Sequence, residues 1–372
     1  MKAKMNWKKV IGWVVAALVV IGVVGINMYN QQNNSTGKRN VYAVLPLTGG
    51  LASVGDEYKK VIDNEIKNTE YPFHIVYVDS ESNPMKGLTA LQAATVSAEN
   101  PIVFSFMSSV GSAIAPYVDQ KKGFMFAVSS QSINTDVTSY QQVATSLAEQ
   151  LDPLIKHILS HYKTLDIVYI MDEYGLAQKR YVINQLNAKR FTKIRELAVP
   201  MNVSDTRNEV TKLLAQNPEA IFVMGNPTLG YINMFKNLKE QGFHGDVLAD
   251  ATLSNPSVRA NIGTHANGVV SVAIKIETEA KQSPKEEVLK NKVESYGIEI
   301  NPKPIQAIDT LSLIKYTLDN NLPFERKTYE NLKNWKSCSG DTITFKNGLS
   351  TYPTILVIYK DGKYYPVESE EK

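Results

Sequence analysis

The stretch YAVLPLTGGLASVGDEYKK at residues 42–60 decides the fold class, because it passes from an apolar run through a turn into a helical pattern. Its first five residues are apolar enough for a buried strand, and the LTGG segment supplies residues that tolerate a tight turn. Apolar residues then recur at helical spacing, at Tyr58, Val61 and Ile62. The stretch therefore predicts a strand, a loop and a helix. In open α/β sheets, small ligands sit at such loops, beyond the carboxyl ends of strands.

The same unit recurs along the chain. Further strands are predicted at residues 73–79, 101–106, 123–129, 164–172, 193–200, 219–225, 246–250 and 268–274. Helical patterns between them predict an α/β protein with parallel, doubly wound sheets. A long amphipathic helix over residues 147–162 separates two sets of units, and 372 residues are enough for two domains. We therefore expect two doubly wound lobes, followed by an antiparallel hairpin over residues 342–366.

The first 40 residues differ from the rest in charge and hydropathy. Residues 10–29 form a run of 20 residues without a charge, preceded by four lysines within residues 1–9. At about 1.5 Å of rise per residue, this run just spans a bilayer core. The positive-inside rule places residues 1–9 in the cytoplasm and the remainder outside. We expect a retained signal anchor with a flexible linker at residues 30–40; a signal peptide cut after Gly25 is the alternative.

Charge and cysteine content restrict the function further. Residues 1–40 hold six of the 40 basic residues and no acidic ones, so 34 basic side chains face 37 acidic ones in the remainder. No dense basic patch is left to bind nucleic acid. The single cysteine, Cys338, cannot form an internal disulfide, so an exported chain must rely on its core for stability.

Sequence motifs of enzymes are missing. His157 and His161 share one helix face, but no Glu follows the first His as a zinc protease requires, which favours a surface pair over a metal site. The glycines of LTGGLASVG do not match GxGxxG, and neither GxxxxGK[ST] nor GxSxG occurs. We therefore expect no catalysis and no bound metal or cofactor.

Six motifs follow one another along residues 41–366: YAVLPLTGGLASVG, VYVDSESNP, IVFSFMSSVGSAIAP, FMFAVSS, IVYIMDEYG and the tyrosine-bearing hairpin. In this order they resemble the periplasmic, or extracytoplasmic, solute-binding proteins of type 1 fold, especially the leucine/isoleucine/valine-binding branch. The resemblance implies two lobes joined by three crossings, with the ligand in the cleft between them and a hinge motion that closes it.

The resemblance also implies how the chain is divided. The crossings are expected near residues 147–151, 272–274 and 334–341. The first lobe would comprise residues 41–148 and 273–335, and the second lobe residues 149–272 and 336–372.

Candidate ligand contacts of the first lobe follow two strands. Ser108 and Ser109 begin a helix whose free N–H groups and dipole suit a carboxylate. Either serine could merely cap the helix, but the family motif implies a ligand contact for Ser109. Ser129 and Gln131 follow the next strand, and the resemblance implies that this loop holds the ligand. Gln131 stands where the family has a threonine; it keeps a donor and an acceptor but reaches further.

The second lobe offers three further candidates. Tyr174 matches a cleft tyrosine of the family, with an apolar face and a polar hydroxyl. Amino-acid binders of the family hold the ligand's ammonium group with an acidic residue near the position of Ala251, and Asp250 is the nearest carboxylate. An amine ligand is favoured only if Asp250 reaches the cleft. Asn226 lies where the family has an aromatic contact, which makes the expected pocket more polar.

These features predict an extracytoplasmic receptor that captures an amino acid or similar small polar ligand and presents it to an ABC permease. A ligand-sensing module that acts on another membrane protein is an alternative with the same fold. An exported α/β enzyme is a third hypothesis, and it lacks an identifiable nucleophile or metal cluster.

Overall fold

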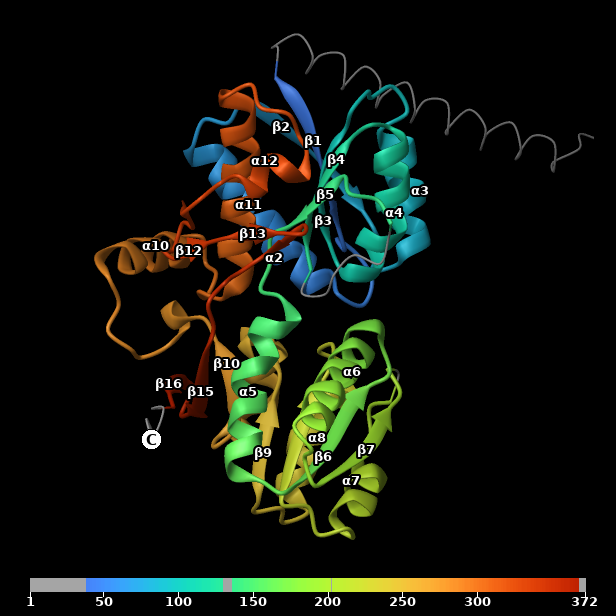
Figure 1. Ribbon diagram of the computed structural model, residues 1–372, viewed down its shortest axis with the longest axis vertical. Helices are drawn as coiled ribbons and strands as arrows, with labels where there is room; N and C mark the ends of the chain where they lie inside the picture. Colours follow the sequence, from blue (N-terminus) through green and yellow to red (C-terminus); the bar gives the residue numbers. More distant parts are fainter. Residues whose placement is uncertain (1–37, 130–135, 202, 368–372) are drawn as a thin grey trace, which may run out of the picture.

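The computed structural model describes residues 38–129, 136–201 and 203–367. The expected transmembrane segment at residues 10–29 and the candidate contact Gln131 lie outside these ranges. Within them, no helix is both long and apolar enough to cross a membrane. The described chain forms two lobes, one above the other in Figure 1, and the prediction of an α/β protein with two doubly wound lobes is confirmed.

The first lobe is built on a parallel five-stranded sheet in the order β2-β1-β3-β4-β5. Its strands are β1 (Arg39–Leu45), β2 (Phe73–Asp79), β3 (Ile102–Phe106), β4 (Phe124–Val128) and β5 (Tyr140–Gln142). In the parallel register Val41 lies beside Ile75 on one side and Ile102 on the other. The central strands are apolar along their whole length because helices cover both faces of the sheet.

Within the described residues, the α-helices of this lobe are α2 (Ala52–Asn68), α3 (Pro84–Ala94), α4 (Ser108–Gln120), α10 (Pro284–Ser295), α11 (Pro302–Asp319) and α12 (Arg326–Glu330). Successive residues of a strand point to opposite faces. Val41 accordingly packs in a core with α2 and α11, whereas Tyr42 packs in another core with α3 and α4. Helices that come from both ends of the sequence therefore enclose the first sheet.

The second lobe is built on a seven-stranded sheet in the order β16-β15-β10-β9-β8-β6-β7. Its strands are β6 (Thr164–Ile170), β7 (Lys193–Val199), β8 (Ala220–Met224), β9 (Asp246–Ala249), β10 (Val270–Ala273), β15 (Ile355–Lys360) and β16 (Lys363–Pro366). The pairs β10–β15 and β15–β16 are antiparallel. All other pairs in this sheet are parallel.

Helices also cover both faces of the second sheet. They are α5 (Leu147–His161), α6 (Glu173–Ala188), α7 (Arg207–Leu214), α8 (Leu229–Glu240) and α9 (Pro256–Ile262), with the short 3-10 helices η1 (Ala251–Ser254) and η2 (Gly263–Ala266). The 3-10 helix η3 (Lys275–Glu277) follows the return to the first lobe, where Ile276 packs in the core. One core packs Ile167 against α5 and α6, and the other packs Val168 against α7 and α8. Because successive residues of β6 point to opposite faces, α5 and α6 cover one face of the sheet, and α7 and α8 cover the other.

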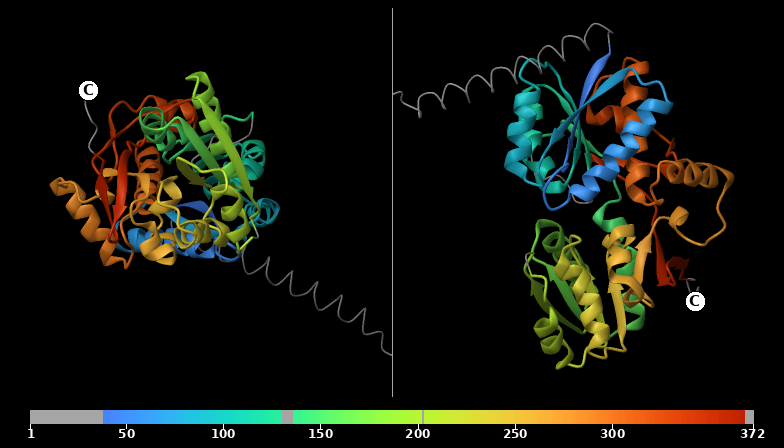
Figure 2. Two further views of the ribbon diagram at one scale, coloured as in Figure 1. Left: turned by 90° about the horizontal axis from the view of Figure 1, so that it is seen from below. Right: turned by 180° about the vertical axis from the view of Figure 1, so that it is seen from behind.

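The chain passes between the lobes three times, and Figure 2 shows from behind that these segments lie on one side of the molecule. Ala144 packs in the first lobe and Leu151 in the second. The chain returns between Ala273 and Ile274. We propose that these two passages are the first two crossings.

The third passage departs from the expectation. The short strands β11 (Trp335–Lys336), β12 (Thr342–Ile343), β13 (Phe345–Lys346) and β14 (Leu349–Ser350) precede it. Ile343, Phe345 and Tyr352 all pack in the core of the first lobe. This packing contradicts a crossing at residues 334–341. We therefore propose that the lobe boundary lies between Tyr352 and Ile355.

The C-terminal hairpin also differs from the prediction. Instead of one hairpin over residues 342–366, the chain makes two. One turns at Asn347 and Gly348, and the other at Asp361 and Gly362, all four with positive φ. Positive φ angles at both central residues are typical of a two-residue type I′ turn, whose twist matches that of the flanking antiparallel strands. The pairs Asn-Gly and Asp-Gly favour this turn.

Candidate ligand-binding cleft

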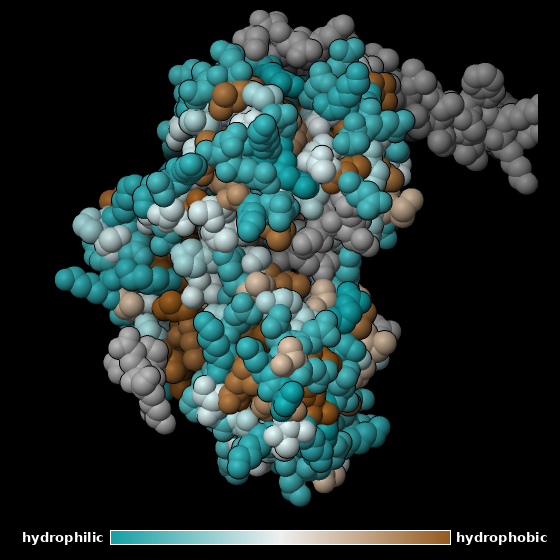
Figure 3. Space-filling model, viewed as in Figure 1, coloured by the Kyte–Doolittle hydropathy of each residue, from teal (hydrophilic) through white to brown (hydrophobic). Residues whose placement is uncertain are grey.

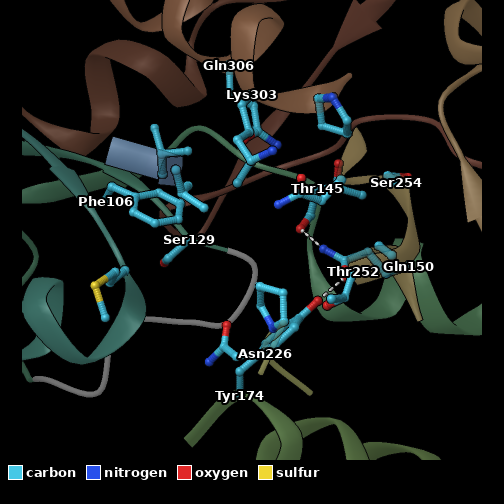
Figure 4. A pocket seen from close by; sticks show the side chains of 18 of the residues that line it. Phe106, Ser129, Thr145, Gln150, Tyr174, Asn226, Thr252, Ser254, Lys303 and Gln306 are labelled. Atoms are coloured by element: carbon cyan, nitrogen blue, oxygen red, sulfur yellow. Dashed lines mark hydrogen bonds between the residues drawn. The ribbon is translucent and has the colours of Figure 1, made fainter. Parts of the chain in front are cut away.

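A cavity of about 210 Å³ lies between the two lobes. In Figure 4, Phe106 and Ser129 approach it from the first lobe, and Tyr174 and Asn226 from the second. Much of its wall is apolar, including Leu51, Val54, Phe106, Val128, Val272 and Ile274. On the face drawn in Figure 3, the lobes are mainly hydrophilic and hydrophobic residues show at the waist between them. Small-molecule sites combine apolar walls with a few polar groups that fix orientation.

Ser108 and Ser109 are the first two residues of α4, and both line the cavity. The preceding residue, Met107, has a φ of 77°, in the left-handed region that residues with side chains seldom adopt. No side chain within the described ranges caps this helix end. The first N–H groups of the helix therefore lack an intrahelical partner at the cavity. This arrangement suits an anionic group such as a carboxylate.

Ser129 follows β4 at the same edge of the first sheet and lines the cavity while only 7% exposed. Its carbonyl oxygen accepts a hydrogen bond from the side-chain amide of Gln142 on β5. This bond fixes the end of β4 against the neighbouring strand. Gln131, the other candidate in this loop, lies outside the described residues.

Tyr174 reaches the cavity from the first turn of α6. Its hydroxyl donates a hydrogen bond of 2.7 Å to Oε1 of Gln150, whose Nε2 donates to the carbonyl oxygen of Thr145 at 2.9 Å. Figure 4 shows both bonds as dashed lines. Gln150 is buried and lies just after the first crossing. The Tyr174 ring is thereby held in place by the segment that joins the lobes.

Asn226 reaches the cavity from the loop after β8. Its backbone N–H donates to Oδ2 of Asp172 at 3.1 Å, and Oδ1 of Asp172 accepts from the N–H of Gly175 at 2.7 Å. One carboxylate thus ties the loop after β8 to the start of α6. Burial raises the pKa of Asp172, and these hydrogen bonds oppose the rise.

Asp250 does not reach the cavity. It is completely buried, and its carboxylate accepts hydrogen bonds from five donors, all within the second lobe. These donors are Nε2 of Gln178, the N–H of Gly225, the hydroxyl of Tyr231, and the N–H and hydroxyl of Thr252. Ala251 lines the cavity instead. The condition that favoured an amine ligand at this position is therefore not met.

Several polar residues that the sequence reasoning did not select also line the cavity, among them Glu277, Lys303 and Gln306. Oε1 of Gln306 accepts from the Tyr58 hydroxyl at 3.1 Å. Nζ of Lys303 pairs with Oε2 of Glu57 at 3.0 Å. Burial raises the pKa of Glu277 to about 7, against the lowering effect of Arg259. These residues lie at the second crossing and on α11, on the hinge side of the cavity.

Comparison with known proteins identifies the family. A family model for periplasmic binding proteins matches residues 41–313. The chain belongs to the periplasmic binding protein family. No sequence among the curated proteins matches this periplasmic binding protein.

Several solved structures share its fold. The leucine-binding protein LivK of Thermotoga maritima is 17% identical, with a TM-score of 0.76 over 89% of this chain and 98% of that one. A solute-binding protein of an ABC transporter from Rhodopseudomonas palustris, in complex with 3,4-dihydroxybenzoic acid, is 18% identical, with a TM-score of 0.74 over 89% and 96%. The branched-chain amino acid binding protein LivJ of Streptococcus pneumoniae, in complex with isoleucine, is 11% identical, with a TM-score of 0.75 over 88% and 97%.

In this periplasmic binding protein, five of the seven residues selected from sequence line one cavity. They are Ser108, Ser109, Ser129, Tyr174 and Asn226. All five follow the carboxyl ends of strands, which is the signal that located them. Glu277, Lys303 and Gln306 follow no parallel strand of their own lobe. The short run IKIET, which places a carboxylate four residues after the apolar strand β10, at a crossing, is a signal that could have found Glu277.

The histidine pair of this periplasmic binding protein lies on α5, away from the cavity. The rings of His157 and His161 stack with centroids 4.1 Å apart. Nε2 of His157 lies 3.4 Å from the Tyr162 hydroxyl. In the part of the chain that the structure describes, no group of three or more His, Cys, Asp or Glu side chains could hold a metal ion.

Proposed function

We propose that this periplasmic binding protein is an extracytoplasmic receptor that binds a small molecule between its lobes and presents it to an ABC permease. The observation that carries the proposal is the cavity, because both lobes and the crossings supply its walls. A ligand in contact with both lobes stabilises the closed arrangement and so changes the shape that a membrane partner meets. The solved relatives include solute-binding proteins of ABC transporters.

The ligand that fits this cavity has an apolar body and a small anionic group. The apolar wall suits a short aliphatic or aromatic body, and the N-terminus of α4 with Ser108 and Ser109 suits a carboxylate. Relatives bind isoleucine and a hydroxylated benzoic acid, which share these two features. We propose a monocarboxylate of this size, bound without chemical turnover.

We further propose that residues 10–29 anchor the receptor to the outer face of the cytoplasmic membrane, on the evidence of their hydropathy and the lysines before them. Fractionation of cells should recover the full-length protein with the membranes, in a form that detergent releases and carbonate does not. Recovery of a shorter protein in the soluble fraction would show that the segment is removed.

Thermal unfolding of the full chain in detergent tests the receptor proposal. The panel contains leucine, isoleucine, 4-methylpentanoate, 4-hydroxybenzoate and 3-methylbutylamine. A ligand that binds only the folded state stabilises it by about 2.7 kcal/mol at a hundredfold excess over its dissociation constant. We expect at least one member to raise the midpoint saturably. An unchanged midpoint with every member would count against the proposal.

A further inference from the structure

Gln306 places an amide group at the cavity that the described residues bind only at its oxygen. The residue lies in the second turn of α11 and lines the cavity, although it is only 8% exposed. Oε1 accepts a hydrogen bond of 3.1 Å from the Tyr58 hydroxyl. Nε2 donates to no described residue, and it is not closed off from the cavity. Once a ligand has displaced water from the cavity, such an amide is costly unless the ligand supplies an acceptor.

The Tyr58 hydroxyl determines which end of the Gln306 amide faces the cavity. Burial raises the pKa of Tyr58 well above its ordinary value, so the hydroxyl keeps its proton and acts as a donor. Oε1 of Gln306 is the acceptor that the described residues provide for it. The Tyr58 ring is held in turn by Phe104 and Phe106, with centroids 6.0 and 4.9 Å away. Oε1 therefore stays turned toward Tyr58, and the two N–H donors of Nε2 are left for the cavity.

Gln306 lies apart from the proposed carboxylate site, and an apolar stretch separates the two. In Figure 4, Gln306 is on the side of the cavity opposite Tyr174 and Asn226. Phe106 lines the cavity, ends β3 just before α4 begins, and packs on Tyr58. The Phe106 ring thus connects the start of α4 with the amide of Gln306. A ligand whose carboxylate lies at α4 would run along this ring and bring its far end to Nε2.

The described residues at this end of the cavity carry no excess positive charge. Lys303, one turn earlier on α11, also lines the cavity, but its Nζ pairs with Glu57 at 3.0 Å. Glu277 is a further carboxylate of the cavity wall, and both Lys303 and Arg259 act on its charge. Arg259 is already paired with Glu299. A second carboxylate on the ligand would therefore lack a counter-charge here, so the acceptor that suits the free amide is uncharged.

We infer that the ligand carries an uncharged carbonyl group at the end away from its carboxylate, and that Nε2 of Gln306 selects this group. The inference rests on the proposed receptor function and names the ligand class, a monocarboxylate with a keto or amide group beyond an apolar span. A purely aliphatic end would leave the amide of Gln306 without an acceptor. A carbonyl only accepts, so it brings no new donor that would need a partner.

Two sets of isosteric probes test the inference with the full chain in detergent. The short set is 4-oxopentanoate, 4-methylpentanoate and succinate, whose far ends are a ketone, an isopropyl group and a carboxylate. The long set repeats these ends on a benzene ring, as 4-acetylbenzoate, 4-isopropylbenzoate and terephthalate. Titration calorimetry should show that the ketone of at least one set binds about tenfold more tightly than its two partners, the effect of one hydrogen bond to an otherwise unsatisfied amide.

Substitutions decide whether Gln306 supplies the donor. Gln306→Met keeps the length of the side chain, removes the amide and should abolish the preference for the ketone. Because this change leaves Tyr58 without its acceptor, a second variant combines it with Tyr58→Phe, which removes both partners and should fold stably with the preference still lost. Thr145→Val removes a hydroxyl from another part of the cavity wall and should leave the preference unchanged.

The carbonyl stretch of the bound ketone reports the contact directly. In 4-oxopentanoate labelled with carbon-13 at the ketone carbon, it should lie at lower frequency in the wild type than in Gln306→Met, because a donated hydrogen bond weakens the C=O bond. If Gln306→Met kept the preference, or if the isopropyl or dicarboxylate probes bound as tightly as the ketones, the inference would be wrong while the receptor function stood. If neither these probes nor the thermal panel showed binding, both would be wrong.

Discussion

The hydroxyl of Tyr231 donates a hydrogen bond of 2.8 Å to Oδ1 of Asp250, and neither side chain is exposed to solvent. Tyr231 belongs to α8, and Gln178, which donates to the other carboxylate oxygen, belongs to α6. Asp250 itself follows β9. One carboxylate thus joins two helices that lie on opposite faces of the second sheet, at the edge that borders the cavity.

Asp250→Ala should destabilise the protein strongly without involving a ligand. The change removes the acceptor of Tyr231 and Gln178 and leaves buried donors unsatisfied, at about 1–3 kcal/mol for each. We expect the free energy of unfolding in urea to fall by about 3 kcal/mol or more. As a control, Asp205→Ala removes an exposed ion pair with Arg207 and should leave the free energy of unfolding almost unchanged. Similar losses in the two variants would contradict the structural role of Asp250.

Glu277→Gln should stabilise the ligand-free protein at alkaline pH. The folded pKa of Glu277, about 7, lies above its ordinary value of 4.5. The protonated form is therefore favoured by folding, and the stability that it contributes is present below about pH 4.5 and is lost as the pH rises through 7. Glutamine has no charge to bury. The variant should gain about 1–3 kcal/mol relative to the wild type between about pH 5 and pH 8.

Urea unfolding at the two pH values measures this gain. The burial of Asp250, whose pKa is raised to about 6, changes stability in the same direction in both proteins and cancels from the comparison. A difference between variant and wild type that did not change with pH would show that Glu277 is not buried as described.

Tyr174→Phe should weaken ligand binding more than it weakens the fold. The change removes the hydrogen bond to Gln150 that positions the ring at the cavity, which should raise the dissociation constant about tenfold. Tyr181→Phe is a matched control, because the Tyr181 hydroxyl also joins α6 to α5, by a 2.8 Å bond to Asp152, but does not line the cavity. Titration of both variants with the member of the ligand panel that binds most tightly compares their dissociation constants. Equal affinity in the two variants would exclude Tyr174 from the site.

Glu299→Gln should shift the ligand-free protein toward an open arrangement. Glu299 belongs to the first lobe, between residues that pack in its core, and Arg259 belongs to α9 of the second lobe. Their ion pair bridges the two lobes. Because it is partly exposed, its loss should change the balance by about 1 kcal/mol or less, which a small increase in the radius of gyration in solution scattering would report.

The matched change for this experiment is Glu196→Gln, which breaks an ion pair with Lys179 inside the second lobe. It should leave the radius of gyration unchanged. An equal response of the two variants would mean that the Arg259–Glu299 pair does not hold the lobes together.

Local sequence patterns located the cavity residues that follow the end of one predicted strand. The five candidates that line the cavity all lie within four residues of the carboxyl end of a strand, and the parallel sheet brings such loops to one edge. The prediction for Asp250 was wrong by one residue. Strand β9 ends at Ala249, and the side chain of Asp250 caps the buried start of η1 instead of entering the cavity. Successive side chains of a strand point to opposite sides. An error of one residue in the predicted end of a strand is therefore enough to confuse a side chain in the cleft with one in the core.

The hinge side of the cavity could not be located in the same way. Glu277 and Lys303 come together with Glu57 and Arg259 only after both lobes are folded, and these residues are far apart in the sequence. The third crossing was misplaced for a related reason. The residues between Trp335 and Ser350 form four strands of two residues each, which are too short to show a period in the sequence.

The interleaved chain also sets the order in which the molecule can be completed. β15 pairs with β10, and Val357, Tyr359 and Tyr364 fill the core of the second lobe, yet these residues leave the ribosome after every other strand of that sheet. Until they emerge, β10 is an exposed edge and its core has a gap. A nascent chain therefore cannot complete the second sheet until its last residues have been made, which is an advantage for a polypeptide that has to cross a membrane before it folds.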